Sequence, residues 1–209
     1  IVVAKWDFGN TTKQDAITDN ASFASSPYTA DDGIVENKDI ATISLGGSVN
    51  YNGWVTGASG TPDKAPNSTA WNLTDGYWQI GIVTTGYKDL TLSSKQQSSN
   101  TGPTDFQIQY STDNGSSWLD VGTAITVANN FTSGVVTDLA LPAECNNLAN
   151  LLIRWRNTSD VSVNNATVQQ GGTNRIDDIV VMGTLDDPCL ATVPFFEGFE
   201  NGYTHATTV

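Results

Sequence analysis

Carboxylates dominate the residues that could do chemistry in this chain of 209 residues, which holds 22 Asp and Glu but a single histidine. That histidine, His205, lies close to the C-terminal end. A triad needs a histidine base and a zinc site needs closely spaced Cys and His, so neither is predicted for the main part of the chain. Paired acids could form a glycosidase dyad only at a suitable separation. We predict that the chain is not an enzyme, although acid pairs occur at Asp31–Asp32, Asp177–Asp178 and Asp186–Asp187.

A second group of residues suits recognition rather than catalysis. Outward positions of neighbouring predicted strands carry glutamine and arginine, in a chain with only 9 Lys and Arg. Aromatic rings stack on the C–H faces of sugars, while amides, carboxylates and guanidinium groups bond the hydroxyls. The alternative is an ordinary solvated face of a sheet. The predicted ligand residues are Trp54, Trp71, Tyr77, Gln79, Gln107, Gln109, Arg154 and Arg156.

The stretch from Ser111 to Trp118 reads Ser-Thr-Asp-Asn-Gly-Ser-Ser-Trp and matches the Asp-box pattern S-x-D-x-G-x-[ST]-W. In such a turn Asp113 accepts hydrogen bonds from backbone N–H groups and Gly115 takes a positive φ. The tryptophan then folds back over the hairpin. We interpret this motif as a structural turn and not as a site.

Short strands must position all of these residues. Apolar residues alternate along about eight to ten runs separated by Gly-, Asn- and Ser-rich turns, which predicts an all-β fold, a two-sheet antiparallel jelly-roll β-sandwich with little helix. Trp6, Trp78 and Trp155 fall on the apolar sides of such runs and are expected in the core. The runs cover residues 2–8, 40–45, 78–83, 90–93, 106–111, 135–141, 151–156 and 176–182.

Helices and long loops are expected between these strands. Residues 143–152, after Pro142, could form one or two helical turns, and residues 14–22 are a weaker candidate. Loops are predicted at residues 25–37, 48–72, 94–104 and 160–174. The second loop is the longest and contains many Gly and Pro residues, and a connection of that kind is usually functional or mobile.

Two motifs near the ends of the main domain resemble a known family. Residues 174–181 read Asn-Arg-Ile-Asp-Asp-Ile-Val-Val, and residues 6–10 read Trp-Asp-Phe-Gly-Asn. They resemble the last and first strands of galactose-binding-like jelly rolls, which include several carbohydrate-binding module families and bacterial surface adhesin-type domains. The last strand matches the family pattern [YR]-I-D-D-[IV], whereas the first departs from F-E-x-G. The resemblance implies a non-catalytic module for glycan binding or adhesion.

In that family the first and last strands often share a structural Ca²⁺, so the resemblance implies Asp7, Asp177 and Asp178 as metal ligands. Adjacent strand residues point to opposite faces, so at most one of Asp177 and Asp178 should be buried toward the core. A buried carboxylate must be paired or metal-bound, and Arg175 is the metal-free alternative partner. A weaker calcium candidate, with a solvated turn as its alternative, is the set Asp31, Asp32 and Glu36.

The C-terminal part of the chain differs from the rest. Residues 1–184 are predicted to form the sandwich, residues 185–194 a linker, and residues 195–209 an extended tail or the incomplete start of a second similar domain. Phe199 and Asn201 repeat the spacing of Phe8 and Asn10, which is a weak repeat pattern. Residues 192–209 could instead add a strand to a neighbouring subunit in a filament. A third hypothesis is an accessory domain of a secreted hydrolase.

Composition limits the partners and the compartment. The net charge of −13 disfavours nucleic acid and anionic membrane surfaces. No stretch approaches the roughly 18 apolar residues of a membrane span. Few lysines, abundant Thr and Asn and a single Met indicate an extracellular or cell-surface protein. Cys145 and Cys189 could form a disulfide or remain two thiols.

Overall fold

The chain folds into two antiparallel β-sheets with two short helices. The structure is a computed structural model and describes residues 1–186. The seven-stranded sheet contains β1 (Val2–Trp6), β2 (Asp32–Gly33), β4 (Asn50–Thr56), β5 (Lys64–Thr69), β7 (Tyr87–Ser98), β10 (Gly134–Ala140) and β12 (Asn174–Leu185). The five-stranded sheet contains β3 (Thr42–Gly46), β6 (Tyr77–Ile82), β8 (Asp105–Ser111), β9 (Leu119–Thr126) and β11 (Leu151–Asn157). The helices are α1 (Thr11–Asp15) and α2 (Asn20–Ser25), and a 3₁₀ turn covers Ala143–Cys145.

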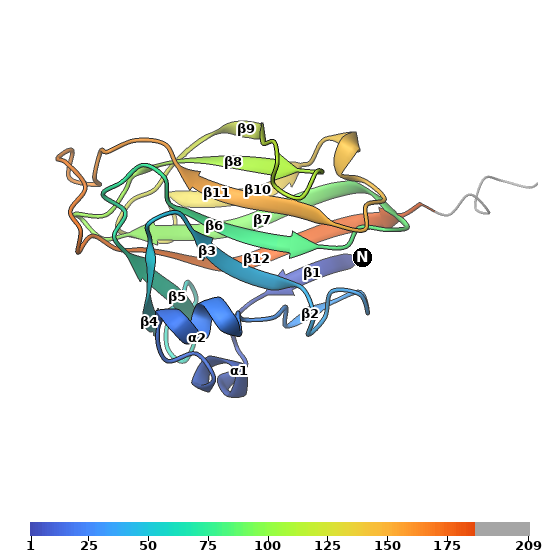
Figure 1. The fold of residues 1–209 in the computed structure, drawn as a ribbon, viewed down its shortest axis with the longest axis horizontal. Coiled ribbons are helices and arrows are strands. Elements are labelled where there is room, and N and C mark those ends of the chain that lie inside the picture. Colours follow the sequence, from blue (N-terminus) through green and yellow to red (C-terminus); the bar gives the residue numbers. More distant parts are fainter. Residues whose placement is uncertain (187–209) are drawn as a thin grey trace, which may run out of the picture.

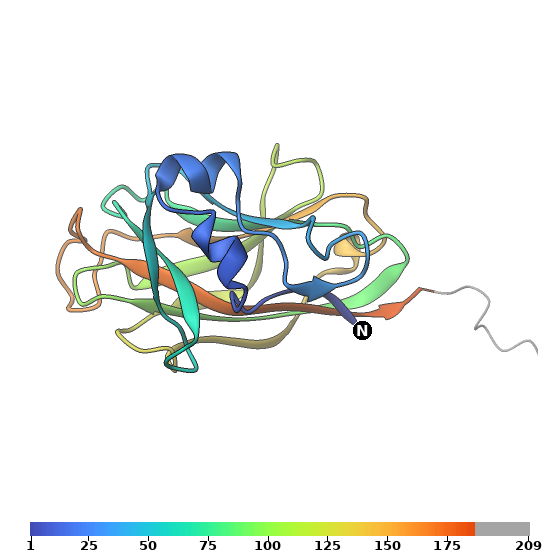
Figure 2. The same cartoon turned by 90° about the horizontal axis from the view of Figure 1, so that it is seen from below.

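The two sheets stack face to face, as the edge-on view in Figure 2 shows. The strand order is β10-β7-β12-β1-β2 in one sheet, with the β4–β5 hairpin joined to β12 through β5, and β3-β6-β11-β8-β9 in the other. From β6 to β12 the chain changes sheet at every step except between β8 and β9 (Figure 1). The predicted two-sheet antiparallel β-sandwich is therefore confirmed. The helix α2 lies beside β3 and β4, and neither α1 nor α2 is long and apolar enough to cross a membrane.

Every predicted strand is present, but the longest predicted loop is not a loop. Residues 48–72 contain the β4–β5 hairpin, in which β5 pairs with β12 at Ser68 and Asn67. The β5 sequence, Lys-Ala-Pro-Asn-Ser-Thr, lacks apolar alternation because its central residues are buried on both sides. The structure also contains β9, which was not predicted. The strand β7 continues to Ser98, so it includes the first part of the predicted loop 94–104.

The helix predictions were only partly right. Residues 14–22 were expected to form one helical segment. Instead α1 ends and α2 begins within this range, and each helix has its own N-cap residue. Asn10 accepts a hydrogen bond from the N–H of Lys13, and Asp19 forms a capping box with Ser22. Of residues 143–152 only the three residues of the 3₁₀ turn are helical.

Most of the residues in the predicted linker and tail lie outside the described residues 1–186. The last strand ends at Leu185, one residue beyond the predicted end of the sandwich. Residues 195–209, and most of the predicted linker, fall outside the described part. Cys145 is buried. The disulfide between Cys145 and Cys189 stays a prediction, because Cys189 lies outside the described residues.

Tryptophans fill the space between the sheets. Trp6, Trp78 and Trp155 are each 0% exposed, as predicted. Trp78 on β6 and Trp155 on β11 are direct cross-strand neighbours in the five-stranded sheet. Each donates its indole N–H across the core to the other sheet, Trp78 to Oδ1 of Asn174 (2.7 Å) and Trp155 to Oγ of Ser94 (3.0 Å).

Asn174, at the start of β12, joins four strands through buried hydrogen bonds. Its Oδ1 also accepts a hydrogen bond from Gln96 (3.3 Å), and its Nδ2 donates to Oγ of Ser98 (3.0 Å), both on β7. Its main-chain oxygen accepts from Oγ of Ser68 on β5 (3.0 Å). A buried polar network of this kind is stable only while each member keeps its partner.

We expect Asn174→Ala to lower the free energy of unfolding by about 2–4 kcal/mol, because it leaves the Trp78 N–H and its neighbours without partners inside the core. Urea unfolding monitored by tryptophan fluorescence measures this loss. The matched control is Asn52→Ala on the exposed side of β4, which should change stability by less than about 0.5 kcal/mol. Equal effects of the two substitutions would contradict the role given to Asn174.

Candidate functional site

The outer face of the five-stranded sheet brings six of the eight predicted ligand residues together. Strand alternation points the apolar residues of β6, β8 and β11 into the core, so the intervening residues point outward. The strand register arranges them in two rows, both half-buried. One row contains Gln79, Arg154 and Gln109, and the next contains Tyr77, Arg156 and Gln107.

Hydrogen bonds across the strands hold the first row in place. Nε of Arg154 donates to Oε1 of Gln109 (2.8 Å), and Nε2 of Gln109 donates to Oδ1 of Asp120 on β9 (2.7 Å). In the second row, Nε2 of Gln107 donates to the main-chain oxygen of Val121 (3.0 Å). The two glutamines therefore act mainly as supports, and Gln109 fixes the direction of the Arg154 side chain.

Two aromatic rings flank Arg154. Its guanidinium carbon lies 3.8 Å from the ring centroid of Trp118 and 5.1 Å from that of Tyr77. Cation–π contacts of this kind favour a fixed guanidinium over a mobile one. The Tyr77 ring extends over β3, where a Cβ on Gly46 would overlap it. Glycine at position 46 thus lets the ring lie close against the strand.

Trp118 belongs to this face, although sequence analysis assigned it only to a turn. The turn itself is confirmed, since Asp113 accepts hydrogen bonds from the N–H (2.9 Å) and Oγ (2.6 Å) of Ser117, and Gly115 has φ 85°. The Trp118 N–H donates to the main-chain oxygen of Gly115 (3.1 Å). The motif places the indole at the end of the β8–β9 hairpin, beside the outer face, and this position could have been recognised from the sequence.

A groove of about 590 Å³ adjoins the face at Arg156. The connection between β5 and β6 forms one side of it, including Asp75, and Asp160 from the loop after β11 contributes another carboxylate. Nη2 of Arg156 lies 3.5 Å from the main-chain oxygen of Thr74, at the limit of a hydrogen bond. Leu73 is 53% exposed at the same place. The groove therefore combines a cation, two carboxylates and an apolar side chain.

The charge environment of Arg154 is unusual for a surface arginine. Burial lowers the pKa of its guanidinium, Tyr77 acts in the opposite direction, and the nearby charge of Arg156 lowers it further. Within residues 1–186, ion pairs are formed by Lys5, Lys13, Lys88 and Lys95, whereas no carboxylate lies within 4.0 Å of Arg154, Arg156, Arg175, Lys38 or Lys64.

The other two predicted ligand residues lie elsewhere. Trp71, a predicted ligand residue within the predicted loop 48–72, is instead buried: its side chain is 0% exposed and donates to Oγ of Ser68 (3.0 Å). Trp54 is half-buried in an aromatic cluster and donates to the main-chain oxygen of Gln14 (3.1 Å). Trp54 lies on β4, whereas Trp71 follows β5 and packs against Trp78 and Phe106, so both rings point inward although the sequence placed both residues in a loop. The rings around Trp54 are those of Phe8, Tyr28 and Tyr51.

The acidic pair on β12 divides as predicted, with Asp177 fully buried and Asp178 half-exposed. Asp177 accepts hydrogen bonds from the N–H groups of Ala58 (2.6 Å) and Asp178 (2.8 Å), so its partners are backbone groups and not Arg175. Gly57 leaves room for a second carboxylate, since a Cβ there would lie 2.5 Å from Oδ2 of both Asp177 and Asp63. Burial raises the pKa of Asp177 to about 8, against the opposing effect of the two N–H groups.

The remaining predicted calcium ligands already have ammonium partners. Asp178 pairs with Lys95 (2.8 Å) and Asp7 with Lys5 (2.9 Å). Residues 1–186 contain no group of three or more His, Cys, Asp or Glu side chains arranged to hold a metal ion. Calcium binding by Asp7, Asp177 and Asp178 therefore stays a prediction.

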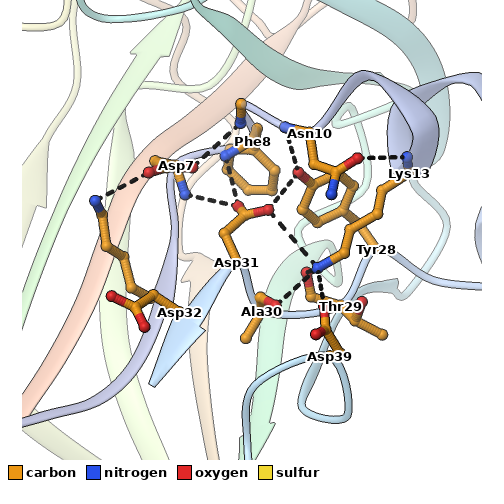
Figure 3. Close-up of polar contacts among 12 residues, drawn as sticks. Asp7, Phe8, Asn10, Lys13, Tyr28, Thr29, Ala30, Asp31, Asp32 and Asp39 are labelled. Carbon is orange, nitrogen blue, oxygen red and sulfur yellow. Dashed lines mark hydrogen bonds and ion pairs between the residues drawn. The ribbon is translucent and has the colours of Figure 1, made fainter.

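The weaker calcium candidate surrounds Asp31, whose contacts Figure 3 shows. One carboxylate oxygen accepts the N–H groups of Asp7 (3.0 Å) and Phe8 (2.9 Å), and the other accepts the Tyr28 hydroxyl (2.7 Å). The Lys13 ammonium lies 3.8 Å from the same carboxylate and donates to main-chain oxygens nearby. This cluster joins the end of β1 to the loop before β2, which is a structural role.

Comparisons with known proteins show similarity of fold only. No family model matches the chain, and no curated protein matches its sequence. The CBM22-1 xylan-binding domain from Paenibacillus barcinonensis is 10% identical, with a TM-score of 0.43 over 69% of this chain and 87% of that domain. TmCBM61 in complex with β-1,4-galactotriose is 9% identical, with a TM-score of 0.37 over 69% and 89% of the two chains. A Paenibacillus xanthan lyase is 14% identical, with a TM-score of 0.45 over 70% of this chain and 13% of the lyase.

The buried carboxyl of Asp177 predicts a specific dependence of stability on pH. An unfolded aspartate has a pKa of about 4, so between about pH 4 and pH 8 the folded state keeps a proton that the unfolded state has lost. Stability should therefore fall as pH rises through this window, by roughly 2–5 kcal/mol. Urea unfolding in EDTA at several pH values measures the fall. Asp177→Asn should remove it, whereas Asp178→Asn should keep it; the same slope in both variants would contradict the assignment.

Calcium chloride added to the EDTA-treated protein at pH 8 tests the calcium prediction. Binding to the folded state alone raises the melting temperature, and the carboxylate form of Asp177 is the one that could bind a cation. Calcium binding at this site predicts a rise in the wild type that Asp177→Asn abolishes. An unchanged melting temperature in the wild type would contradict the prediction that this protein binds calcium.

Proposed function

We propose that this chain is a non-catalytic glycan-binding module whose ligand lies on the outer face of the five-stranded sheet. The observation that carries the proposal is the half-buried cluster of Tyr77, Arg154 and Trp118 on the outer face, which a polar groove adjoins at Arg156. A sugar ring has apolar C–H faces and a rim of hydroxyl groups, so it needs flat aromatic surface next to fixed hydrogen-bonding groups. The face supplies both.

The geometry of the face favours a polymer over a single sugar. Five strands about 4.8 Å apart give a face roughly 20 Å wide, which is room for several sugar units in a row. Tyr77 provides a ring close against the sheet, over Gly46. Asp75 and Asp160 in the groove can accept hydroxyl hydrogens. Gln79, which lies between Ser44 and Arg154 in the strand register, can donate or accept.

The proposal extends to the biological setting. The module would belong to a larger secreted or cell-surface bacterial protein and hold that protein on a polysaccharide, in adhesion or beside a hydrolase domain. Both settings use the same binding face. The other hypothesis, a filament subunit that adds a strand to its neighbour, concerns residues 192–209, outside the described part of the chain.

We expect Tyr77→Ala and Trp118→Ala each to weaken glycan binding by about tenfold or more, because each removes a stacking surface of the face. Affinity electrophoresis against a panel of polysaccharides, followed by calorimetry on those bound, measures the effect. Tyr77→Phe keeps the ring and should bind like the wild type, and circular dichroism checks that each variant is folded. Binding to none of the polysaccharides, or binding unaffected by both alanine variants, would refute the proposal.

A further inference from the structure

We propose that the ligand is an acidic polysaccharide, and that Arg154 and Arg156 bind a carboxylate on its sugar rings. This inference rests on the proposed glycan-binding function and specifies the class of glycan. It starts from two cations side by side on one face, neither of which forms an ion pair with a carboxylate of residues 1–186. The structure supports it by the position, the orientation and the surroundings of each guanidinium group.

The position of the two arginines is the first observation. They are two residues apart on β11, so both point outward from the same sheet face. The chain has 22 acidic and 9 basic residues, so acidic partners are abundant. Among the residues described neither guanidinium has a carboxylate within 4.0 Å, which is also true of Arg175, Lys38 and Lys64, so what distinguishes Arg154 and Arg156 is that they lie side by side on one face. Two like charges side by side on a half-buried face cost stability, and a bound anion would offset this cost.

The orientation of Arg154 is the second observation. Its Nε is bonded to Gln109 and its plane is flanked by Trp118 and Tyr77, so little side-chain entropy remains to be lost on binding. The two Nη groups have no hydrogen-bond partner within residues 1–186. A planar guanidinium held in this way presents parallel N–H groups, the arrangement that binds a carboxylate with two hydrogen bonds.

The surroundings of Arg156 are the third observation. It lies at the junction between the face and the groove, and its contact with the Thr74 oxygen is long enough (3.5 Å) to be replaced by a ligand. Asp75 and Asp160 line the same groove without pairing with it. Carboxylates accept hydrogen bonds from sugar hydroxyls, and guanidinium groups donate to acidic substituents. An acidic sugar carries both kinds of group, so it can satisfy both kinds of side chain, whereas a neutral sugar leaves the arginines without a counter-charge.

The net charge of −13 opposes an acidic polymer at long range, so the attraction must be local. At about 0.15 M salt the Debye length is about 8 Å, which screens distant acids but leaves close contacts effective. Titrations therefore use this ionic strength. The probes are polygalacturonate, alginate and hyaluronan, each compared with its carboxyl-reduced form, in which every carboxylate is a neutral CH₂OH group. Dextran sulfate with dextran, and neutral xylan and galactan, complete the panel.

We expect binding to at least one of the three uronate polymers and at least tenfold weaker binding to its carboxyl-reduced form. Arg154→Gln and Arg156→Gln should each weaken uronate binding by about tenfold, because each removes charge-assisted hydrogen bonds. Arg154→Lys should restore only part of it, since an ammonium keeps the charge but not the planar pair of donors. Lys38→Gln removes a charge from an exposed turn and should have no effect. Melting curves of all four variants check folding.

Three results would overturn the inference. Binding only to neutral xylan, galactan or the carboxyl-reduced polymers, with dependence on Tyr77 and Trp118, would refute the acidic ligand and leave the glycan-binding function standing. Binding to dextran sulfate without any uronate polymer would refute the carboxylate. Binding to no polysaccharide in the panel would refute both the inference and the proposed function.

Discussion

Two hydrogen bonds link the sheets through the core, from the indole N–H groups of Trp78 and Trp155 to acceptors on the opposite sheet. Trp78 and Trp155 are large enough to fill the space between the sheets, but each has one polar atom that cannot reach water. Asn174 and Ser94, on the opposite sheet, accept these hydrogens. The two sheets can therefore stack in one relative position, because sliding one sheet over the other would leave these donors unpaired.

The outer face follows from this arrangement. Once Trp78 and Trp155 point inward, the residues beside them in the same strands must point outward, and the pairing of the two tryptophans also aligns their neighbours. Arg154 thereby falls beside Gln109, and Arg156 beside Tyr77. The pairing of Trp78 with Trp155 in the core thus also sets the positions of the charged and aromatic groups on the proposed binding face. The packed core directly beneath the strands holds these groups rigid.

Sequence reasoning succeeded where a residue's environment is set by its own strand. Alternation alone correctly assigned the three core tryptophans and the outward side chains of β6, β8 and β11. It failed for Trp54 and Trp71. The ring of Trp54 packs on Phe8, and the ring of Trp71 packs on Phe106, and both partners lie far away along the chain. The Asp-box turn was predicted correctly from its local chemistry, yet the contact between Trp118 and Arg154 crosses from one hairpin to another strand.

The sequence by itself determined the fold class, most of the strands and which faces of them are polar, since each of these depends on residues within a few positions of one another. Only the tertiary structure decided which strands are neighbours, and hence that two rows of outward residues form one face. It also decided that Asp177 lies under a distant turn and that Arg154 lies against Trp118. Burial, cation–π contact and the absence of a nearby counter-charge within the described residues are properties of three-dimensional neighbours, and no local pattern in the chain encodes them.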